Sequence, residues 1–296
     1  MGRDQGRLAR RRAAGTAGLL AVPVSWLTVL FLAPVAMVAL YSVGVLTLFP
    51  GDEGLSLDGW RGFFESSLYP SLLWKSVRIA LVVAVACVIV AYPIAYALAM
   101  LAGRRKYILL LLIIVPFWTS FLLRVLAWKV ILGENGVVNS FVFWLGLRED
   151  GNPIPQLIYS QTTVVLVLIY VWVPFVVLPI FVSLVSLDRG LLEAAADLGA
   201  SRRQAFLRVT LPLTLPGVMA GFAFAFIPTI GEFVTPALVG GPDGFMYGNA
   251  IANQFGPSFD WKTGSVLSLM LFAAVAVLAL AFSRFLQLRN VAMDEG

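Results

Sequence analysis

Charged residues are absent from six long stretches of the chain. These cover residues 13–51, 79–103, 107–123, 151–187, 209–231 and 263–283. A helix needs about 20 apolar residues to cross the hydrocarbon core of a bilayer. Five stretches have that length, and the third extends toward Arg124 and Lys129, whose long side chains reach the interface. The pattern predicts six transmembrane helices, near residues 17–45, 76–102, 107–132, 160–187, 213–239 and 263–285.

The composition agrees with a membrane protein. Hydrophobic residues make up 60% of the chain and charged residues 12%, whereas soluble domains carry about 25% charged residues. We therefore expect the fold class to be all-α transmembrane, with lipid as the main solvent. A single six-span domain at 17–285 is expected, with a basic tail at 1–16 and a second tail at 286–296.

The basic residues predict the orientation. Fourteen of the 21 lysines and arginines fall in the two tails and in the segments that follow the second and fourth spans. Basic residues accumulate on the cytoplasmic side of a membrane protein, so both termini are expected in the cytoplasm. This distribution accounts for the net charge of +5 through topology, and it gives no reason to expect a nucleic-acid partner.

The sequence offers little for catalysis. It contains one cysteine, Cys87, and no histidine, which argues against a disulfide within the chain and against a zinc site. The string Gly256–Thr263 has Trp261 where a phosphate-binding loop needs its second glycine. No two acids lie at helical spacing inside a span. We expect no catalytic residue, no metal and no nucleotide in this chain.

The connection between the fourth and fifth spans carries a helical pattern. Residues 191–198 are rich in helix formers, and Gly199 stands where a helix end favours a left-handed residue. Ser201 is placed to cap a second helix, which Pro212 ends. The loop 188–212 is thus predicted to be a short helix, a glycine turn and another short helix. In the fifth span, Gly217 and Gly221 have the spacing that permits close helix packing.

This loop resembles a known pattern. Glu193-Ala194-Ala195, three residues, Gly199, and then Val209-Thr210-Leu211-Pro212 nine residues later are similar to the cytoplasmic loop of permeases of binding-protein-dependent ABC importers. Only valine in place of isoleucine departs from the family pattern. The resemblance implies a six-helix ABC importer permease bundle in a bacterial inner membrane. It assigns ATPase coupling to Glu193, Ala194, Ala195, Gly199, Leu211 and Pro212.

The same resemblance implies the partners. A second permease, expected to be a related heterodimer partner, would complete the pathway, and two ATPase subunits would bind ATP and magnesium. An extracytoplasmic substrate-binding protein would deliver the cargo. The alternatives are a passive channel or ion-driven carrier and a membrane-embedded enzyme. A proton-coupled carrier would place titratable groups in mid-membrane.

Further segments resemble the polyamine branch of these permeases, the putrescine type above all. They are residues 116–124 (PFWTSFLLR), 191–200, 226–234 (FIPTIGEFV), 240–243 and 260–261. The resemblance implies putrescine or spermidine as cargo. Permeases for opines, amino-acid-like compounds or other small solutes share parts of these segments and remain an alternative.

Cation chemistry points to candidate pathway residues. Polyamines are cations, so carboxylates and aromatic faces suit them. Glu232 lies near the outer end of the fifth span among Pro228, Gly231 and Pro236, where we expect a bent helix. An ion pair with Arg124 or Lys129 is the equally weighted alternative for this carboxylate. The aromatic candidates, for which plain packing is the alternative, are Phe117, Trp118, Phe226 and Phe233.

Overall fold

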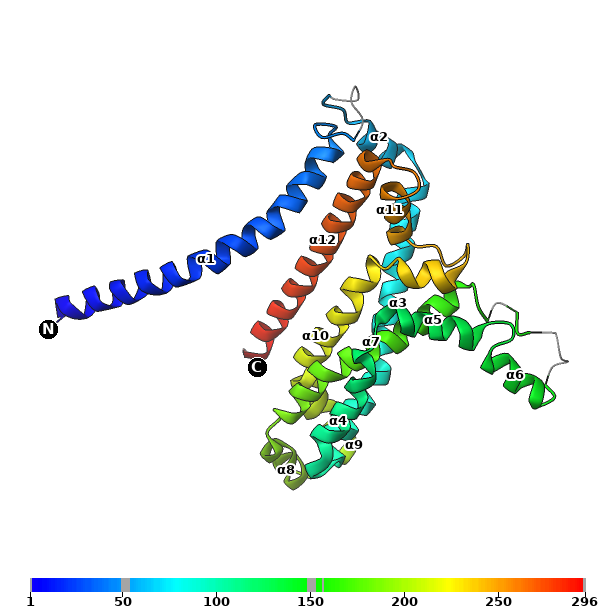
Figure 1. Ribbon diagram of the computed structural model, residues 1–296. Coiled ribbons are helices and arrows are strands. Elements are labelled where there is room, and N and C mark those ends of the chain that lie inside the picture. Colours follow the sequence, from blue (N-terminus) through cyan, green and yellow to red (C-terminus); the bar gives the residue numbers. More distant parts are fainter. Residues whose placement is uncertain (1, 49–53, 148–152, 156, 295–296) are drawn as a thin grey trace. The chain divides into compact units, whose positions relative to one another are not determined.

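The computed structural model describes residues 2–48, 54–147, 153–155 and 157–294. Residues 1 and 295–296, the extremes of the two predicted tails, lie outside the described residues. Every regular element in the described part is helical (Figure 1). The elements are α1 (Gly2–Ser42), α2 (Asp58–Glu65), α3 (Leu68–Tyr96), α4 (Lys106–Ile114), α5 (Phe121–Leu132), α6 (Val137–Trp144), α7 (Gln161–Val185), α8 (Arg189–Asp197), α9 (Arg202–Ala205), α10 (Leu211–Ile230), α11 (Tyr247–Phe255) and α12 (Trp261–Asp294).

Within the described residues, five helical stretches are long and apolar enough to cross a membrane. They are Ala21–Ser42, Leu68–Leu101, Gln161–Val185, Arg202–Ile230 and Trp261–Ala281. A sixth candidate is the pair Gly103–Trp118 and Phe121–Trp144, which meet at an angle of 85°. These positions agree with the six predicted spans, and the all-α transmembrane fold class is confirmed.

The backbone breaks inside two spans: the third is predicted to be a continuous helix, whereas a bend is predicted in the fifth. In the third span, Thr119 and Ser120 adopt extended ψ angles of 158° and 133° after the turn Val115–Trp118. Pro116 within that turn has no N–H to continue a helical ladder. In the fifth span, α10 ends at Ile230, and a π-helical turn at Pro236–Gly240 follows. The bend that Pro228, Gly231 and Pro236 predict is therefore present.

The chain divides into two compact units. The first comprises the residues up to Ser66 together with Asn253–Ala273, and the second comprises Ser67–Ala252 together with Ala274 onward. In the first unit, the end of α1 and the start of α12 meet through the rings of Tyr41 and Trp261, whose centroids are 5.4 Å apart. The Lys262 ammonium lies 3.9 Å from the Asp58 carboxylate of α2.

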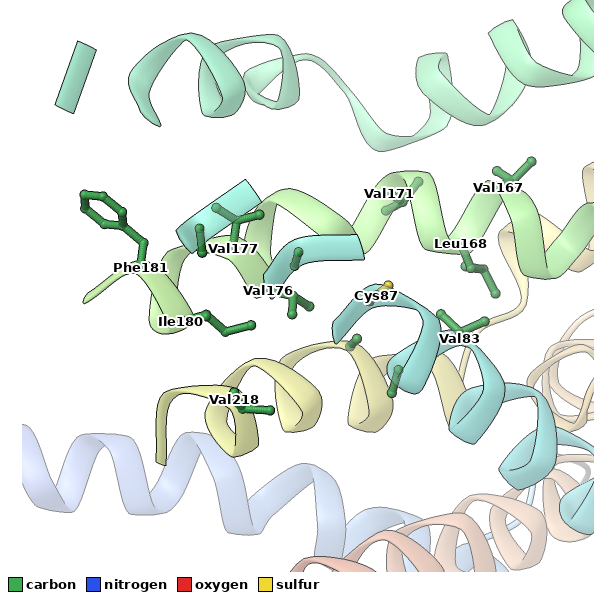
Figure 2. Close-up of a cluster of buried hydrophobic side chains, with 14 of the residues drawn as sticks. Val83, Cys87, Val167, Leu168, Val171, Val176, Val177, Ile180, Phe181 and Val218 are labelled. Atoms are coloured by element: carbon green, nitrogen blue, oxygen red, sulfur yellow. The ribbon is translucent and has the colours of Figure 1, made fainter. Parts of the chain in front are cut away.

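The core of the second unit lies where α3, α7 and α10 pack against one another. Most of its side chains are small or branched, among them Val83, Cys87 and Val176 (Figure 2). Gly217 of α10 allows the closest approach: a Cβ there would come within 2.4 Å of the Ser183 Cβ and 2.6 Å of the Pro179 carbonyl oxygen. The Gly217/Gly221 pair therefore serves packing of α10 on α7 inside this chain.

Candidate coupling loop and substrate pathway

The first helix of the predicted coupling loop is capped at both ends. At its start, the Asp188 side chain accepts a hydrogen bond of 2.9 Å from the Gly190 N–H. At its end, Gly199 has φ +80°. The Gly199 N–H donates to the Ala196 carbonyl and the Ala200 N–H to the Ala195 carbonyl, at 2.9 and 3.0 Å. This is the paired C-terminal closure that a left-handed glycine makes possible.

The second helix of the loop begins with a reciprocal cap. The Ser201 hydroxyl accepts from the Gln204 N–H at 3.3 Å, and the Gln204 side-chain oxygen accepts from the Ser201 N–H at 2.8 Å. Such a box satisfies two N–H groups that the first turn of a helix leaves unpaired. The loop is thus a helix, a glycine turn and a helix, as its sequence predicts.

The predicted coupling residues lie partly at the surface of the chain. Glu193, Ala194 and Gly199 are exposed, whereas Ala195, Leu211 and Pro212 are half-buried. Beside them, the side chain of Leu198 is 89% exposed.

The loop is fastened to the transmembrane helices by Phe206, which the sequence reasoning did not single out. Its ring meets the rings of Tyr92 and Tyr96 of α3 edge-on, at centroid distances of 5.8 and 5.7 Å. The Tyr92 hydroxyl lies 3.0 Å from the Thr214 hydroxyl of α10. Through these contacts the loop packs on α3, and α3 is joined to α10. The sequence did contain a signal for this contact, because two tyrosines four residues apart lie on the same face of a helix.

Glu232 lies in the break after α10 and caps the next helical segment. Its Oε1 accepts from the N–H groups of Val234 and Thr235, at 2.9 and 3.1 Å. In the part of the chain that the structure describes, neither Arg124 nor Lys129 forms an ion pair with it. The predicted alternative of such a pair is therefore absent from this structure, and a local cap takes its place.

The Phe117 ring already contacts a cationic side chain of the same chain. The Arg124 guanidinium lies 4.9 Å from the Phe117 ring centroid, and the Tyr170 ring lies 5.3 Å from that centroid. The Nε and one terminal nitrogen of Arg124 are buried without a hydrogen-bond partner in the structure. Arg124 and Tyr170 were not among the predicted aromatic and acidic candidates, although an arginine inside an apolar stretch is itself a signal.

The other predicted pathway aromatics lie in different settings. Trp118 is 80% exposed. Phe226 stacks on Phe222 at a centroid distance of 5.2 Å and lines an apolar groove with residues 275–281 of α12. Phe233 is exposed beside Glu232, and its carbonyl accepts from the Asn249 side chain at 2.7 Å. Among the described residues, no ring or polar contact joins the candidates near the third span to those near the fifth.

Comparison with known proteins decides the family. Residues 91–292 match the model of the binding-protein-dependent transport system inner membrane component. The chain belongs to this family. It is 35% identical over 272 residues to the spermidine/putrescine transport system permease protein PotB of Escherichia coli K12, which covers 90% of this chain and 96% of the relative. This permease is thus a multi-pass inner-membrane transport subunit and not an enzyme.

Solved structures share the fold of this permease. A bacterial ABC transporter involved in the import of the acidic polysaccharide alginate matches with a TM-score of 0.75 at 15% identity, over 94% of this chain and 98% of the other. The alginate transporter in complex with its pentasaccharide-bound periplasmic protein matches with a TM-score of 0.72 at 14% identity, over 92% and 93%. The importer-permease bundle expected from the coupling-loop pattern is confirmed as the fold.

Proposed function

We propose that this permease carries polyamines, such as putrescine and spermidine, into the cytoplasm as part of an ATP-driven importer. The observation that carries the proposal is the 35% identity with a spermidine/putrescine permease, which extends over 90% of the chain. Both termini face the cytoplasm in this proposal, in accordance with the excess of basic residues in the tails and in the segments 104–106 and 189–208.

The permease works with several partners in the proposed machinery. A second, related permease completes the pathway, and a soluble receptor delivers the cargo from outside. Two ATPase subunits bind ATP and magnesium, since this chain has no phosphate-binding loop. The loop 188–212 docks on one ATPase through Glu193, Ala194, Ala195 and Gly199, with Leu211 and Pro212 leading into the membrane.

Transport proceeds by alternating access in this proposal. ATP can shift the transporter only if its binding favours one facing state over the other. Closure of the ATPases moves the docked loop, and the contacts of Phe206 with Tyr92 and Tyr96 carry that motion to α3. The hydroxyl contact between Tyr92 and Thr214 carries it to α10. The breaks after Trp118 and Ile230 allow the outer halves of these spans to move separately.

The break after α10 is also the proposed place where the permease meets its cargo. Glu232 brings a carboxylate there, and Phe233 brings an exposed ring beside it. Only one oxygen of Glu232 accepts the two backbone N–H groups, so the second oxygen is available for an ammonium group. Trp118 and Phe226 are proposed to line the path elsewhere, and Phe117 contributes through its contact with Arg124.

An uptake experiment in cells tests the substrate class. Bacteria that lack their own polyamine importers would express this chain with its three kinds of partner, and the control cells would lack only this chain. We expect uptake of labelled putrescine that unlabelled spermidine suppresses and neutral amino acids leave unchanged. Uptake of another solute in place of polyamines would leave the importer but overturn the proposed cargo.

A further inference from the structure

A cavity of about 360 Å³ opens in the first unit, which contains none of the proposed pathway residues. It lies between the segment that follows α1 and the start of α12. Its aromatic lining consists of Tyr41, Phe259 and Trp261, and its charged lining of Asp260 and Lys262. This volume is at the lower end of the range of small-molecule sites, about 300 to 1,000 Å³. In the proposed topology the cavity faces the outside.

The walls of this outer pocket are held in place by the backbone. The Gly54 N–H donates to the Gly44 carbonyl at 3.3 Å, and the Ser56 N–H donates to the Val43 carbonyl at 3.0 Å. Gly44 has φ +74°, and a Cβ there would lie 2.6 Å from the Gly54 carbonyl oxygen. These contacts tie residues 43 and 44 to residues 54 and 56 in the first unit.

The aromatic side of the pocket is equally ordered. The Trp261 ring lies 5.4 Å from the Tyr41 ring and 5.4 Å from the Phe255 ring. Its indole Nε1 is buried with no hydrogen-bond partner in the structure. Phe259 has φ +49°, a left-handed backbone that bulky residues rarely adopt and that tends to mark functional positions. Three aromatic side chains thus line one small space.

The charges leave one carboxylate free for a ligand. The Lys262 ammonium donates to the Ser56 hydroxyl at 2.7 Å and lies beside Asp58. The hydrogen bond from Ser56, and then the charge of Lys262, lower the pKa of the Asp58 carboxyl. The opposite charges of Asp58 and Lys262 therefore balance each other. In contrast, Asp260 uses only Oδ1, which accepts from the Thr263 N–H at 3.0 Å. Its Oδ2 has no hydrogen-bond or ion-pair partner among the described residues.

We propose that the outer pocket binds an alkylammonium group, such as one end of a polyamine, through the Asp260 carboxylate and the rings of Tyr41, Phe259 and Trp261. A carboxylate beside aromatic faces is the chemistry that recognises such a cation. The identity of the cargo rests on the proposed function, but the pocket gives the permease an amine site of its own, separate from the soluble receptor.

Direct binding tests the pocket. The full-length chain, assembled with its membrane and ATPase partners in lipid nanodiscs and free of receptor, would be titrated with labelled spermidine. We expect saturable binding that putrescine displaces and the neutral analogue 1,4-butanediol does not. Asp260→Asn keeps an acceptor for the Thr263 N–H but removes the charge, and Trp261→Leu removes the largest ring. Each is expected to weaken binding about fivefold or more, and Asp260→Glu to restore most of it.

Matched control variants show whether a loss of spermidine binding is specific to the pocket residues. Glu65→Gln removes an exposed carboxylate of the same unit outside the pocket, and Trp144→Leu removes a 78% exposed tryptophan of α6. Both are expected to bind spermidine like the wild type. The proposal is overturned if the wild type binds none, or if Asp260→Asn and Trp261→Leu match the controls. In that case the rings act only as interfacial anchors. Polyamine uptake that persists alongside such a result would leave the proposed function intact.

Discussion

Glu232 shows how a single side chain can serve two purposes at the break after α10. Glu232 holds the following segment by accepting the N–H groups of Val234 and Thr235. It also places a negative charge at the proposed path of a cation. The cap needs only an oxygen, whereas attraction of the cargo needs the charge, so substitution can separate the two roles.

Glu232→Gln is expected to lower polyamine uptake about tenfold, which corresponds to ~1.4 kcal/mol, with little change in thermal stability because the amide oxygen still caps. Glu232→Ala loses the cap as well and is expected to cost about 1 kcal/mol of stability. Uptake rates and melting curves of the purified assembly would be compared with those of Glu134→Gln, which removes an exposed carboxylate between α5 and α6. Unchanged uptake in Glu232→Gln would show that Glu232 serves only as a helix cap and does not attract the cargo.

Gly217 gives the second prediction at this scale. Because an added Cβ would meet Ser183 and Pro179 within 2.6 Å, Gly217→Ala must push α10 away from α7. Overpacking of this kind costs about 1–3 kcal/mol. Thermal unfolding in detergent measures it, with Gly62→Ala as the control, since a Cβ at Gly62 meets nothing within 4 Å. Equal stability of the two variants would contradict the packing described here.

At the scale of elements, the coupling loop depends on both local and distant contacts. Its two helices, their caps and the glycine turn follow from residues within a few positions of one another, and sequence reasoning predicts them for that reason. The attachment of Phe206 to α3 is different, because Tyr92 and Tyr96 lie more than 100 residues away in sequence. No local propensity encodes that approach.

Phe206→Ala tests the mechanical role of this attachment. Loss of two edge-on ring contacts, each worth about 0.5–1.5 kcal/mol, is expected to loosen the loop from α3 while α8 and its exposed docking residues remain. The ATPases should still co-purify, but less solute should be moved per ATP hydrolysed. Leu207→Ala, which truncates an exposed neighbour, serves as the control. Normal coupling in Phe206→Ala would exclude this ring as the link.

At the scale of the whole molecule, hydropathy and charge predict the number of spans and the fold, because lipid imposes simple length and polarity rules on helices. The 85° bend after Trp118 is not predicted. It depends on extended backbone at Thr119 and Ser120, which composition does not reveal. The proposed pathway residues likewise occupy separate settings, as expected if a second permease supplies the other wall of the path.

The most direct test of the account is ATP-driven flux through a purified system. Proteoliposomes would contain this chain with its second permease and ATPases, and labelled putrescine would be supplied with the receptor on the side opposite the ATPases. We expect uptake that requires ATP and receptor, and that Gly199→Trp abolishes because a bulky side chain at φ +80° disrupts the docking turn. The variant should still insert into the membrane. Putrescine flux without ATP, or normal ATP-driven uptake by Gly199→Trp, would contradict the account.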